Sequence, residues 1–233
     1  TRTESDLIGS REVPESALYG VQTLRGIENF RISKFHLNEY PLFIQALAIT
    51  KMGAAVANRE LDLLTEEQTD AILRACKEIL EGKHHEQFPV DMIQGGAGTT
   101  TNMNINEVVA NRALELMGHQ RGEYQYCSPN DHVNRSQSTN DAYPTAIHIG
   151  LYYTHLKLVK HFEVLIEAFR KKGSEFAHII KMGRTQLEDA VPMTLGQTFN
   201  GFASILEHEV KNLDFAAQDF LTVNMGATAI GTG

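Results

Sequence analysis

Three polar segments interrupt otherwise apolar helical sequence, and each combines small hydroxyl side chains with neutral amides. They are GGAGTTTNMN (residues 95–104), SQSTND (136–141) and GRTQ (183–186). We expect each segment to lie beside the start or end of a helix, where backbone N–H groups are unpaired and carry a partial positive charge at a helix start. Hydroxyls and amides placed there can hold an anion without a cationic side chain. These residue types therefore suggest anion binding by short neutral donors.

Each segment also has a structural interpretation that the sequence leaves open. Thr139 or Asn140 could be a helix N-cap, and Gln186 could be an amide satisfied within its loop. Arg184 could be a surface charge or the partner in a structural ion pair. The glycine-rich run at 95–98 fits neither P-loop spacing nor a full dinucleotide fingerprint, so it could be only a turn.

Other catalytic and metal-binding patterns are missing from the sequence. None of the ten histidines belongs to an H-E-x-x-H motif, so we expect structural roles for them and no metal site. Spacing reveals no Ser-His-Asp or Cys-His arrangement. Cys76 and Cys127 lack motif spacing, which indicates a reducing compartment rather than a disulfide framework.

The composition is that of a soluble globular protein. Of 233 residues, 42% are hydrophobic and 21% are charged, and the net charge is −8. This balance argues against nucleic-acid or anionic-membrane partners, which require clustered Lys and Arg. It is compatible with an anionic small substrate. Without a signal peptide or an uninterrupted apolar span, we expect a cytoplasmic location and no membrane partner.

The first 120 residues predict short elements followed by helices. Residues 1–40 contain several glycines and prolines without a helical period, which predicts extended segments and turns. Helical patterns follow at 41–61 and from Thr65, where Gln68 completes a capping box, to a stop at Gly82. Another apolar stripe at 105–117 ends at Gly118.

Two longer helical patterns dominate the rest of the chain. They run from about 142 to 182, with Pro144 in the first turn, and from about 194 to 225, and each predicts a helix longer than about 25 residues, twice the usual mean. Apolar residues cover more than half of each circumference, so further helices from sequence not included here or from other subunits must cover them. The chain starts at Thr1 rather than Met and stops in NMGATAIGTG, so we expect a fragment.

Four motifs in order carry a resemblance that covers essentially the whole chain. REVPESALYGVQTLRGIENF, GAGTTTNMNINEVVANRALELMG, SQSTNDAYPT and GRTQLEDAVPMTLGQ together resemble the aspartate ammonia-lyases (aspartases) of the fumarase/aspartase superfamily. Fumarases resemble SSND more than the STND of this chain, and they usually carry histidine at the place of Gln186, where some aspartases have glutamine. Class II fumarate hydratase is therefore the alternative. A non-catalytic crystallin of the superfamily is a rival of another class.

The resemblance implies a mainly α fold and a lyase activity. An N-terminal mixed and helical lyase domain, residues 1–137, would precede the first long helices of a central multi-helix bundle, residues 138–233. Family members eliminate ammonia reversibly from L-aspartate to give fumarate through an aci-carboxylate intermediate. By similarity, Thr99, Ser138 and Thr139 bind the β-carboxylate, and Asn140 and Thr185 contact the amino group or the α-carboxylate. Gln186 is also expected to bind the substrate. Asn102 and Arg184 are expected to position the binding residues without contacting the substrate.

The resemblance places the catalytic base on a segment that this sequence lacks. The base of the family is a serine on a loop of the form G-S-S-x-M-P-x-K-x-N, which also supplies a lysine and an asparagine for the α-carboxylate. The motif does not occur up to Gly233, so no residue here is assigned as base, and we expect residues 1–233 alone to be inactive. Relatives are homotetramers with active sites shared between subunits. They need no organic cofactor, and divalent cations activate some of them.

Overall fold

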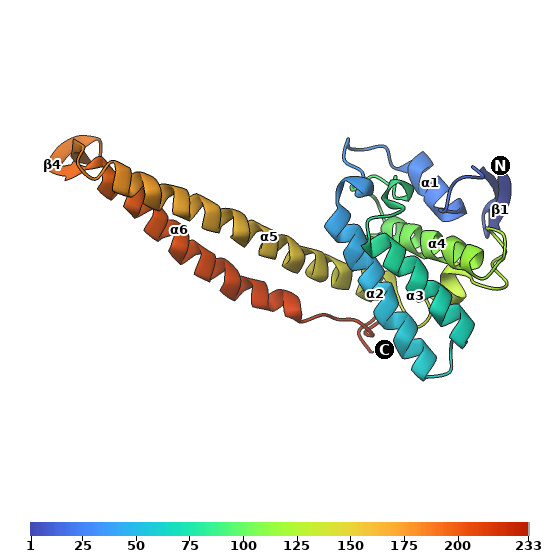
Figure 1. Ribbon diagram of the computed structural model, residues 1–233. Coiled ribbons are helices and arrows are strands. Elements are labelled where there is room, and N and C mark those ends of the chain that lie inside the picture. The colour runs from blue at the N-terminus through green and yellow to red at the C-terminus, as the bar shows by residue number, and fades with distance from the viewer. Residues whose placement is uncertain (233) are drawn as a thin grey trace. The chain divides into compact units, whose positions relative to one another are not determined.

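Six helices and two hairpins make up the computed structural model, which describes residues 1–232 (Figure 1). The helices are α1 (Val21–Asn29), α2 (Pro41–Glu60), α3 (Glu66–Leu80), α4 (Thr99–Leu116), α5 (Thr139–Glu175) and α6 (Leu195–Ala217). Strands β1 (Arg2–Asp6) and β2 (Gly9–Val13) form one antiparallel hairpin, and β3 (Ile180–Thr185) and β4 (Glu188–Thr194) form the other. Short helical turns are η1 (Leu37–Glu39), η2 (His85–Gln87), η3 (Pro129–Val133) and η4 (Gln218–Leu221). The mainly helical prediction is confirmed.

The chain divides into two compact units. The first comprises residues 1–150 together with 223–232, and the second comprises residues 151–222. Helix α5 begins in the first unit and continues into the second. The units therefore divide at 150/151, inside α5, whereas the domain boundary predicted from the resemblance lies at 137/138.

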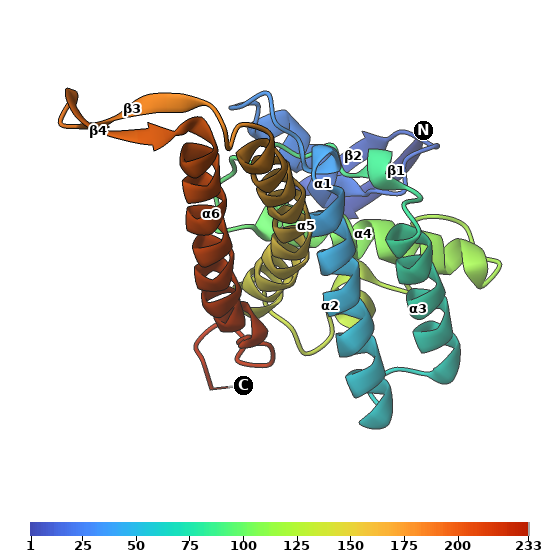
Figure 2. The same ribbon diagram turned by 60° about the vertical axis from the view of Figure 1, so that its left-hand side comes forward.

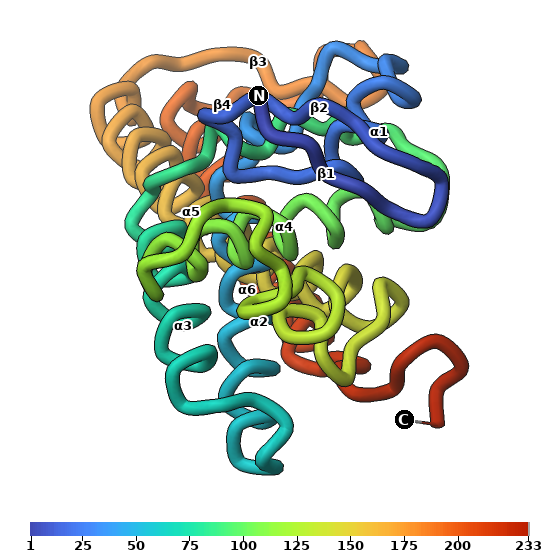
Figure 3. Tube along the Cα trace, turned by 90° about the vertical axis from the view of Figure 1, so that its right-hand side faces the viewer, coloured from blue at the N-terminus to red at the C-terminus, as the bar shows by residue number. Residues whose placement is uncertain are grey.

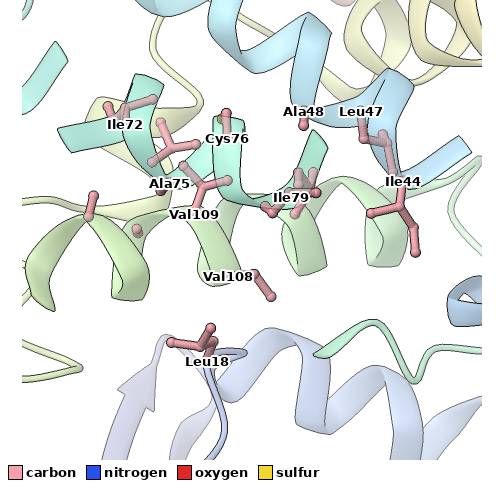
Figure 4. Packing of buried hydrophobic residues seen from close by; sticks show 14 of the residues in the cluster. Leu18, Ile44, Leu47, Ala48, Ile72, Ala75, Cys76, Ile79, Val108 and Val109 are labelled. Carbon is pink, nitrogen blue, oxygen red and sulfur yellow. The ribbon is translucent and has the colours of Figure 1, made fainter. Parts of the chain in front are cut away.

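Helices α2, α3 and α4 build the core of the first unit (Figure 4). The capping box predicted at the start of α3 is present, with Thr65 Oγ1 accepting from the Gln68 N–H and the Gln68 side chain accepting from the Thr65 N–H. Gly82 follows the helix with a φ of +86°, as a helix stop requires. The core side chains of these three helices include Ile44, Leu47, Ile72, Cys76, Ile79, Ile105, Val108 and Val109.

Within residues 1–40, the expected extended segments form a hairpin, and the structure also has a helix that was not predicted. Both strands of the β1–β2 hairpin contact α1 (Figure 3). The N-cap of α1 is Gly20, which has no side chain to cap the helix. Instead, the Glu107 carboxylate of α4 accepts from the Gly20, Gln22 and Thr23 N–H groups at 2.8–3.0 Å. A cap supplied from so far along the chain leaves no local signal, which explains the missed helix.

Helix α5 starts close to the position predicted, about residue 142, and its 37 residues make it the long helix that was expected. Its first residue is Thr139, so Pro144 lies in the second turn rather than in the first. Proline has no N–H to donate to the carbonyl four residues earlier. The Asn224 side chain donates to that carbonyl, Asn140 O, at 3.0 Å and thereby replaces the missing bond.

In the second unit, α5 and α6 lie side by side and the β3–β4 hairpin joins them (Figure 2). Thr194 caps α6 with a capping box that Gln197 completes, so the predicted start is confirmed. Two expected ends were wrong. Helix α5 ends at Glu175, and Met182 lies in β3. Helix α6 ends at Ala217 after 23 residues, where the chain enters η4 instead of continuing to about residue 225.

The helix pair of the second unit packs closely near the hairpin and exposes apolar side chains along its length. A side chain at Gly196 would collide with the Gly173 carbonyl and the Ala177 backbone, so glycine permits this approach. Apolar side chains that are at least two-fifths exposed include Leu151, Leu156, Val164, Leu165, Phe202, Ile205 and Phe215. As the sequence indicated, two such helices do not bury each other completely.

Candidate functional site

The N-terminus of α5 is built by Ser138, Thr139, Asn140 and Asp141. Ser138 Oγ accepts from the Asn140 N–H at 3.2 Å, and Asp141 Oδ1 accepts from the Ser138 N–H at 2.9 Å. Ser138 is therefore the N-cap, and the alternative that Thr139 or Asn140 fills this position is wrong. Because Thr139 and Asn140 stand in the first helical turn, their side chains are available for another purpose.

The glycine-rich segment brings the start of α4 against the same end of α5. Gly98 precedes α4 with a φ of +91°, and a Cβ there would lie 2.6 Å from the Tyr143 ring of α5. Glycine is required for both reasons, conformation and close approach. Thr99 is exposed and donates its hydroxyl to Gly96 O at 2.7 Å. The segment thus joins α4 to the site, and its two predicted residues Thr99 and Asn102 belong to the first turn of α4.

A cavity of about 580 Å³ opens between these two helix starts. Its lining residues are Met92, Gln94, Ala97, Gly98, Thr139, Asn140, Tyr143 and Pro144. Thr139 and Asn140 thus lie where a small molecule would have room to bind, whereas Thr99 and Ser138 flank the cavity without lining it. An oxygen-rich small anion would meet neutral donors there, as the residue types suggested.

A buried lysine is linked to Thr139 by hydrogen bonds through Asn102, and the sequence patterns did not point to it. Lys51 of α2 is fully buried, and its Nζ donates to Asn102 Oδ1 at 2.8 Å, Gln137 Oε1 at 2.9 Å and Asn134 Oδ1 at 3.0 Å. Asn102 Nδ2 in turn donates to Thr139 Oγ1 at 3.3 Å. Burial lowers the pKa of Lys51 to about 7. The available signal was a charged residue inside the apolar pattern of 41–61.

Asp141 connects segment 224–229 to the N-terminal end of α5 by hydrogen bonds. Its Oδ2 accepts from the Gly226 and Thr228 N–H groups at 3.1 and 3.0 Å, and its side chain is fully buried. Asn140 Nδ2 also donates to Ala229 O at 3.2 Å. Segment 224–229 therefore adjoins the candidate site, a role that its sequence had not indicated.

The GRTQ segment belongs to the second unit, where it forms part of the β3–β4 hairpin. The expectation that it adjoins a helix end is wrong, because residues 188–194 pair with 180–185 before α6 begins. Thr185 ends β3, and Gln186 begins the turn with a φ of +49°; both side chains are exposed. Arg184 Nε lies 3.5 Å from Asp189 Oδ1, and both side chains are more than two-thirds exposed. Arg184 thus has the surface ion pair that the sequence left open.

The residues that the structure describes include neither a cluster of metal-binding side chains nor a helix suited to a membrane. Among residues 1–232, no three His, Cys, Asp or Glu side chains gather into a group that could hold a metal ion. Over the same residues, no helix combines the length and apolar character needed to cross a membrane. The ligand-binding roles of Thr99, Ser138, Thr139, Asn140, Thr185 and Gln186 stay predictions, as do the supporting roles of Asn102 and Arg184.

Comparison with known proteins places the chain in a family. A family model described as Lyase matches residues 9–233. The chain belongs to this lyase family. Over 233 residues the lyase chain is 58% identical to the aspartate ammonia-lyase of Pseudomonas canavaninivorans, a match that covers 100% of this chain and 49% of that protein. The chain thus spans about half the length of the curated relatives that it matches.

Solved structures share the fold of this lyase chain. A fumarate lyase:delta crystallin from Brucella melitensis matches with a TM-score of 0.95 and 51% identity, over 97% of this chain and 51% of that one. A class II fumarase from Schistosoma mansoni matches with a TM-score of 0.90 and 36% identity, over 99% of this chain and 48% of that one. The predicted fold of the fumarase/aspartase superfamily is therefore confirmed.

Proposed function

We propose that the protein that carries this chain is an aspartate ammonia-lyase, which eliminates ammonia reversibly from L-aspartate to give fumarate. The observation that carries the proposal is the 58% identity to an aspartate ammonia-lyase over all 233 residues, against 36% to the class II fumarase. The cavity at the start of α5, with Thr139 and Asn140 in its wall, supports it.

The chemistry of the elimination explains why neutral donors suit this cavity. Removal of a proton from the carbon beside the β-carboxylate leaves a carbanion, whose charge spreads into that carboxylate as an aci-carboxylate with two negative charges. Hydroxyl and amide donors aimed at these oxygens stabilise the growing charge without acting as competing proton sources. Loss of one such donor typically costs about 100- to 1000-fold in rate.

The hydrogen bonds at the site leave donors for this purpose. Ser138 Oγ and Thr139 Oγ1 both accept a hydrogen bond from the protein, so the hydrogen of each hydroxyl is available for the β-carboxylate. Asn140 gives one of its two amide hydrogens to Ala229 O and keeps the other for the substrate. Thr99 must release Gly96 O before it can donate to a carboxylate.

The remaining roles follow the family resemblance. Thr185 would contact the amino group or the α-carboxylate, and Gln186 would bind the substrate but, as an amide, could not transfer protons. The proton-abstracting group is assigned to no residue of this chain. No organic cofactor is needed, and a divalent cation would act at most as an activator.

We further propose a homotetramer in the cytoplasm that serves amino-acid catabolism. The exposed apolar side chains of α5 and α6 support assembly, because contiguous apolar surface of this kind is seldom left in water. Residues from different subunits would then complete each active site. This arrangement would let Thr185 and Gln186 act although they belong to the second unit.

The experiment separates ammonia-lyase from fumarate hydratase. The purified protein that carries this chain is given L-aspartate or L-malate while fumarate absorbance is followed, and the reverse reaction is run with fumarate and either ammonia or water. We expect turnover of aspartate and addition of ammonia. Turnover of malate alone would establish the alternative, and turnover of neither substrate would favour the non-catalytic crystallin class.

A further inference from the structure

Lys51 is an ionisable side chain with no solvent contact, and the roles proposed so far do not use it. It is the largest fully buried side chain of the described chain. In residues 1–232, no carboxylate oxygen pairs with its Nζ within 4.0 Å, and the neighbouring thiol of Cys76 is neutral because burial raises its pKa to about 12. Asp141 favours the ammonium form of Lys51 only through its more distant charge. A buried charge of this kind is costly unless it is fully hydrogen-bonded.

The three partners of Lys51 match an ammonium group. All three are amide oxygens at 2.8–3.0 Å, and an ammonium has three donors and no acceptor. A neutral amine would instead turn its lone pair toward one of these oxygens. The ammonium therefore also fixes the orientation of the three amides, because each must present its oxygen to Lys51.

This orientation decides the direction of the hydrogen bond to Thr139. With Asn102 Oδ1 held by Lys51, Asn102 Nδ2 points away and donates to Thr139 Oγ1 and Asn134 Oδ1, at 3.3 and 3.1 Å. Asn134 is fixed in the same sense, since its Nδ2 donates to Gln137 O at 3.2 Å. Thr139 Oγ1 is thus an acceptor toward the protein, and its own hydrogen is free to point into the cavity.

We propose that Lys51 is a positioning residue that, through Asn102, holds the Thr139 hydroxyl as a donor toward the substrate carboxylate. The inference rests on the proposed lyase function and adds the mechanism that sets the direction of donation. A hydroxyl that donated to Asn102 would present a lone pair to the carboxylate and repel it. The Lys51 ammonium therefore acts on the reaction without contacting the substrate.

The decisive variant is Asn102→Asp in the full-length protein. The introduced carboxylate has nearly the same shape and still accepts from Lys51, but it has no hydrogen to give Thr139. The Thr139 hydroxyl then donates to the carboxylate and is lost to the substrate. We expect kcat for L-aspartate to fall by about 10- to 100-fold while KM changes less, since the donor acts on charge that grows in the transition state.

The melting temperature separates this role from a structural one. Asn102→Asp gives Lys51 a charged partner, so the melting temperature should be unchanged or higher. If the network served stability alone, this stable variant would keep its turnover. Thr50→Val is the matched control on α2, because Thr50 Oγ1 is buried and donates only to Ala46 O. It should retain wild-type kcat.

A double-mutant cycle excludes simple repulsion between the introduced carboxylate and the substrate. In a Thr139→Ala background, Asn102→Asp should lower kcat less than threefold, because the hydroxyl through which it acts is gone. An equal loss in both backgrounds would overturn the inference, as would wild-type kcat for Asn102→Asp alone. Absence of turnover in the wild-type protein would instead overturn the proposed function. Lys51→Met should reproduce the loss; if it does not fold, the cycle still decides.

Discussion

In the first unit, α2, α3 and α4 bury their apolar side chains against one another, whereas in the second unit α5 and α6 leave many of theirs exposed. Ile105 of α4 has no exposed surface, and Ile205 of α6 is 61% exposed. The polar residues differ in the same way. Lys51, Asn102 and Asp141 have internal partners, whereas the GRTQ hairpin lies on the surface.

The difference indicates which parts of the proposed site are preorganised by the chain itself. The donors at the start of α5 are oriented by hydrogen bonds within the first unit. The hairpin that carries Thr185 and Gln186 has no such support among the described residues beyond its own strand pairing and the Arg184–Asp189 pair. We infer that assembly with other copies, as proposed above, is needed to fix the hairpin.

The largest expected effect comes from removing the same side chain in each unit. Ile105→Ala leaves a cavity in a closed core, so it should lower the free energy of unfolding by about 2–5 kcal/mol at every protein concentration. Ile205→Ala should lower stability only where the protein is assembled, so its melting temperature should depend on concentration. Chemical denaturation over a hundredfold dilution series measures both. If both variants lost the same free energy of unfolding at every protein concentration, the proposed difference between the two units would be wrong.

The next effect concerns Asp141, which holds segment 224–229 in the first unit. Asp141→Asn replaces one acceptor oxygen by a donor that faces other donors, so it should cost about 2–3 kcal/mol. Hydrogen exchange of the Gly226 and Thr228 amides should accelerate accordingly. Asp189→Asn, on the exposed hairpin, is the matched control and should leave exchange at both amides unchanged. Undisturbed exchange in Asp141→Asn would mean that the segment is held by other contacts.

How much of this arrangement the sequence predicts depends on how far apart the partners are in the chain. The start of α3 was predictable because Thr65 and Gln68 cap it locally. Helix α1 was missed because its cap is Glu107, on another helix. Helix α6 was predicted too long because its apolar pattern continues through Phe220 and Val223, past Ala217, where the chain leaves the α-helix and enters η4.

The same distinction between local signals and distant partners applies to the residues of the candidate site. The place of Thr139 and Asn140 at a helix start was predictable from their residue types and the apolar pattern that follows, whereas their role in binding stays a prediction. Lys51 was not predictable, because its partners Asn102, Asn134 and Gln137 come from two other segments. The hairpin around GRTQ was missed as well, since only the pairing of two strands, and no local capping signal, defines it.

A smaller effect comes from an ion pair that joins α3 and α4 in the first unit. The Arg112 guanidinium lowers the pKa of Glu78 to about 2, against its usual value of 4.5, and His84 adds to the shift. A lowered carboxyl pKa adds stability above pH 4.5 that is lost as the pH falls toward 2. Glu78→Gln should therefore cost about 2 kcal/mol at pH 7 and almost nothing at pH 2. A pH-independent loss would contradict the ion-pair account.

The smallest effect comes from the equivalent substitution in the second unit. Arg170 of α5 pairs with Glu207 of α6 at 2.8 Å, but both side chains are more than two-fifths exposed. Solvent screens such a pair, so Glu207→Gln should change the free energy of unfolding by less than about 1 kcal/mol at pH 7. The same denaturation series tests it, and a loss as large as that of Glu78→Gln would show that the pair is shielded, for example by a neighbouring subunit.

The most direct test of the neutral-donor site is the turnover of three variants in the segment before and within the first turn of α5. In the full-length protein, Thr139→Ala and Asn140→Ala should each lower kcat for fumarate formation from L-aspartate by about 100-fold, with unchanged circular dichroism. Ser136→Ala is the control, because Ser136 Oγ donates to Asn58 Oδ1 rather than lining the cavity, and it should keep near-normal turnover. Near-normal turnover in Thr139→Ala and Asn140→Ala would contradict the account and leave these two residues a purely structural role.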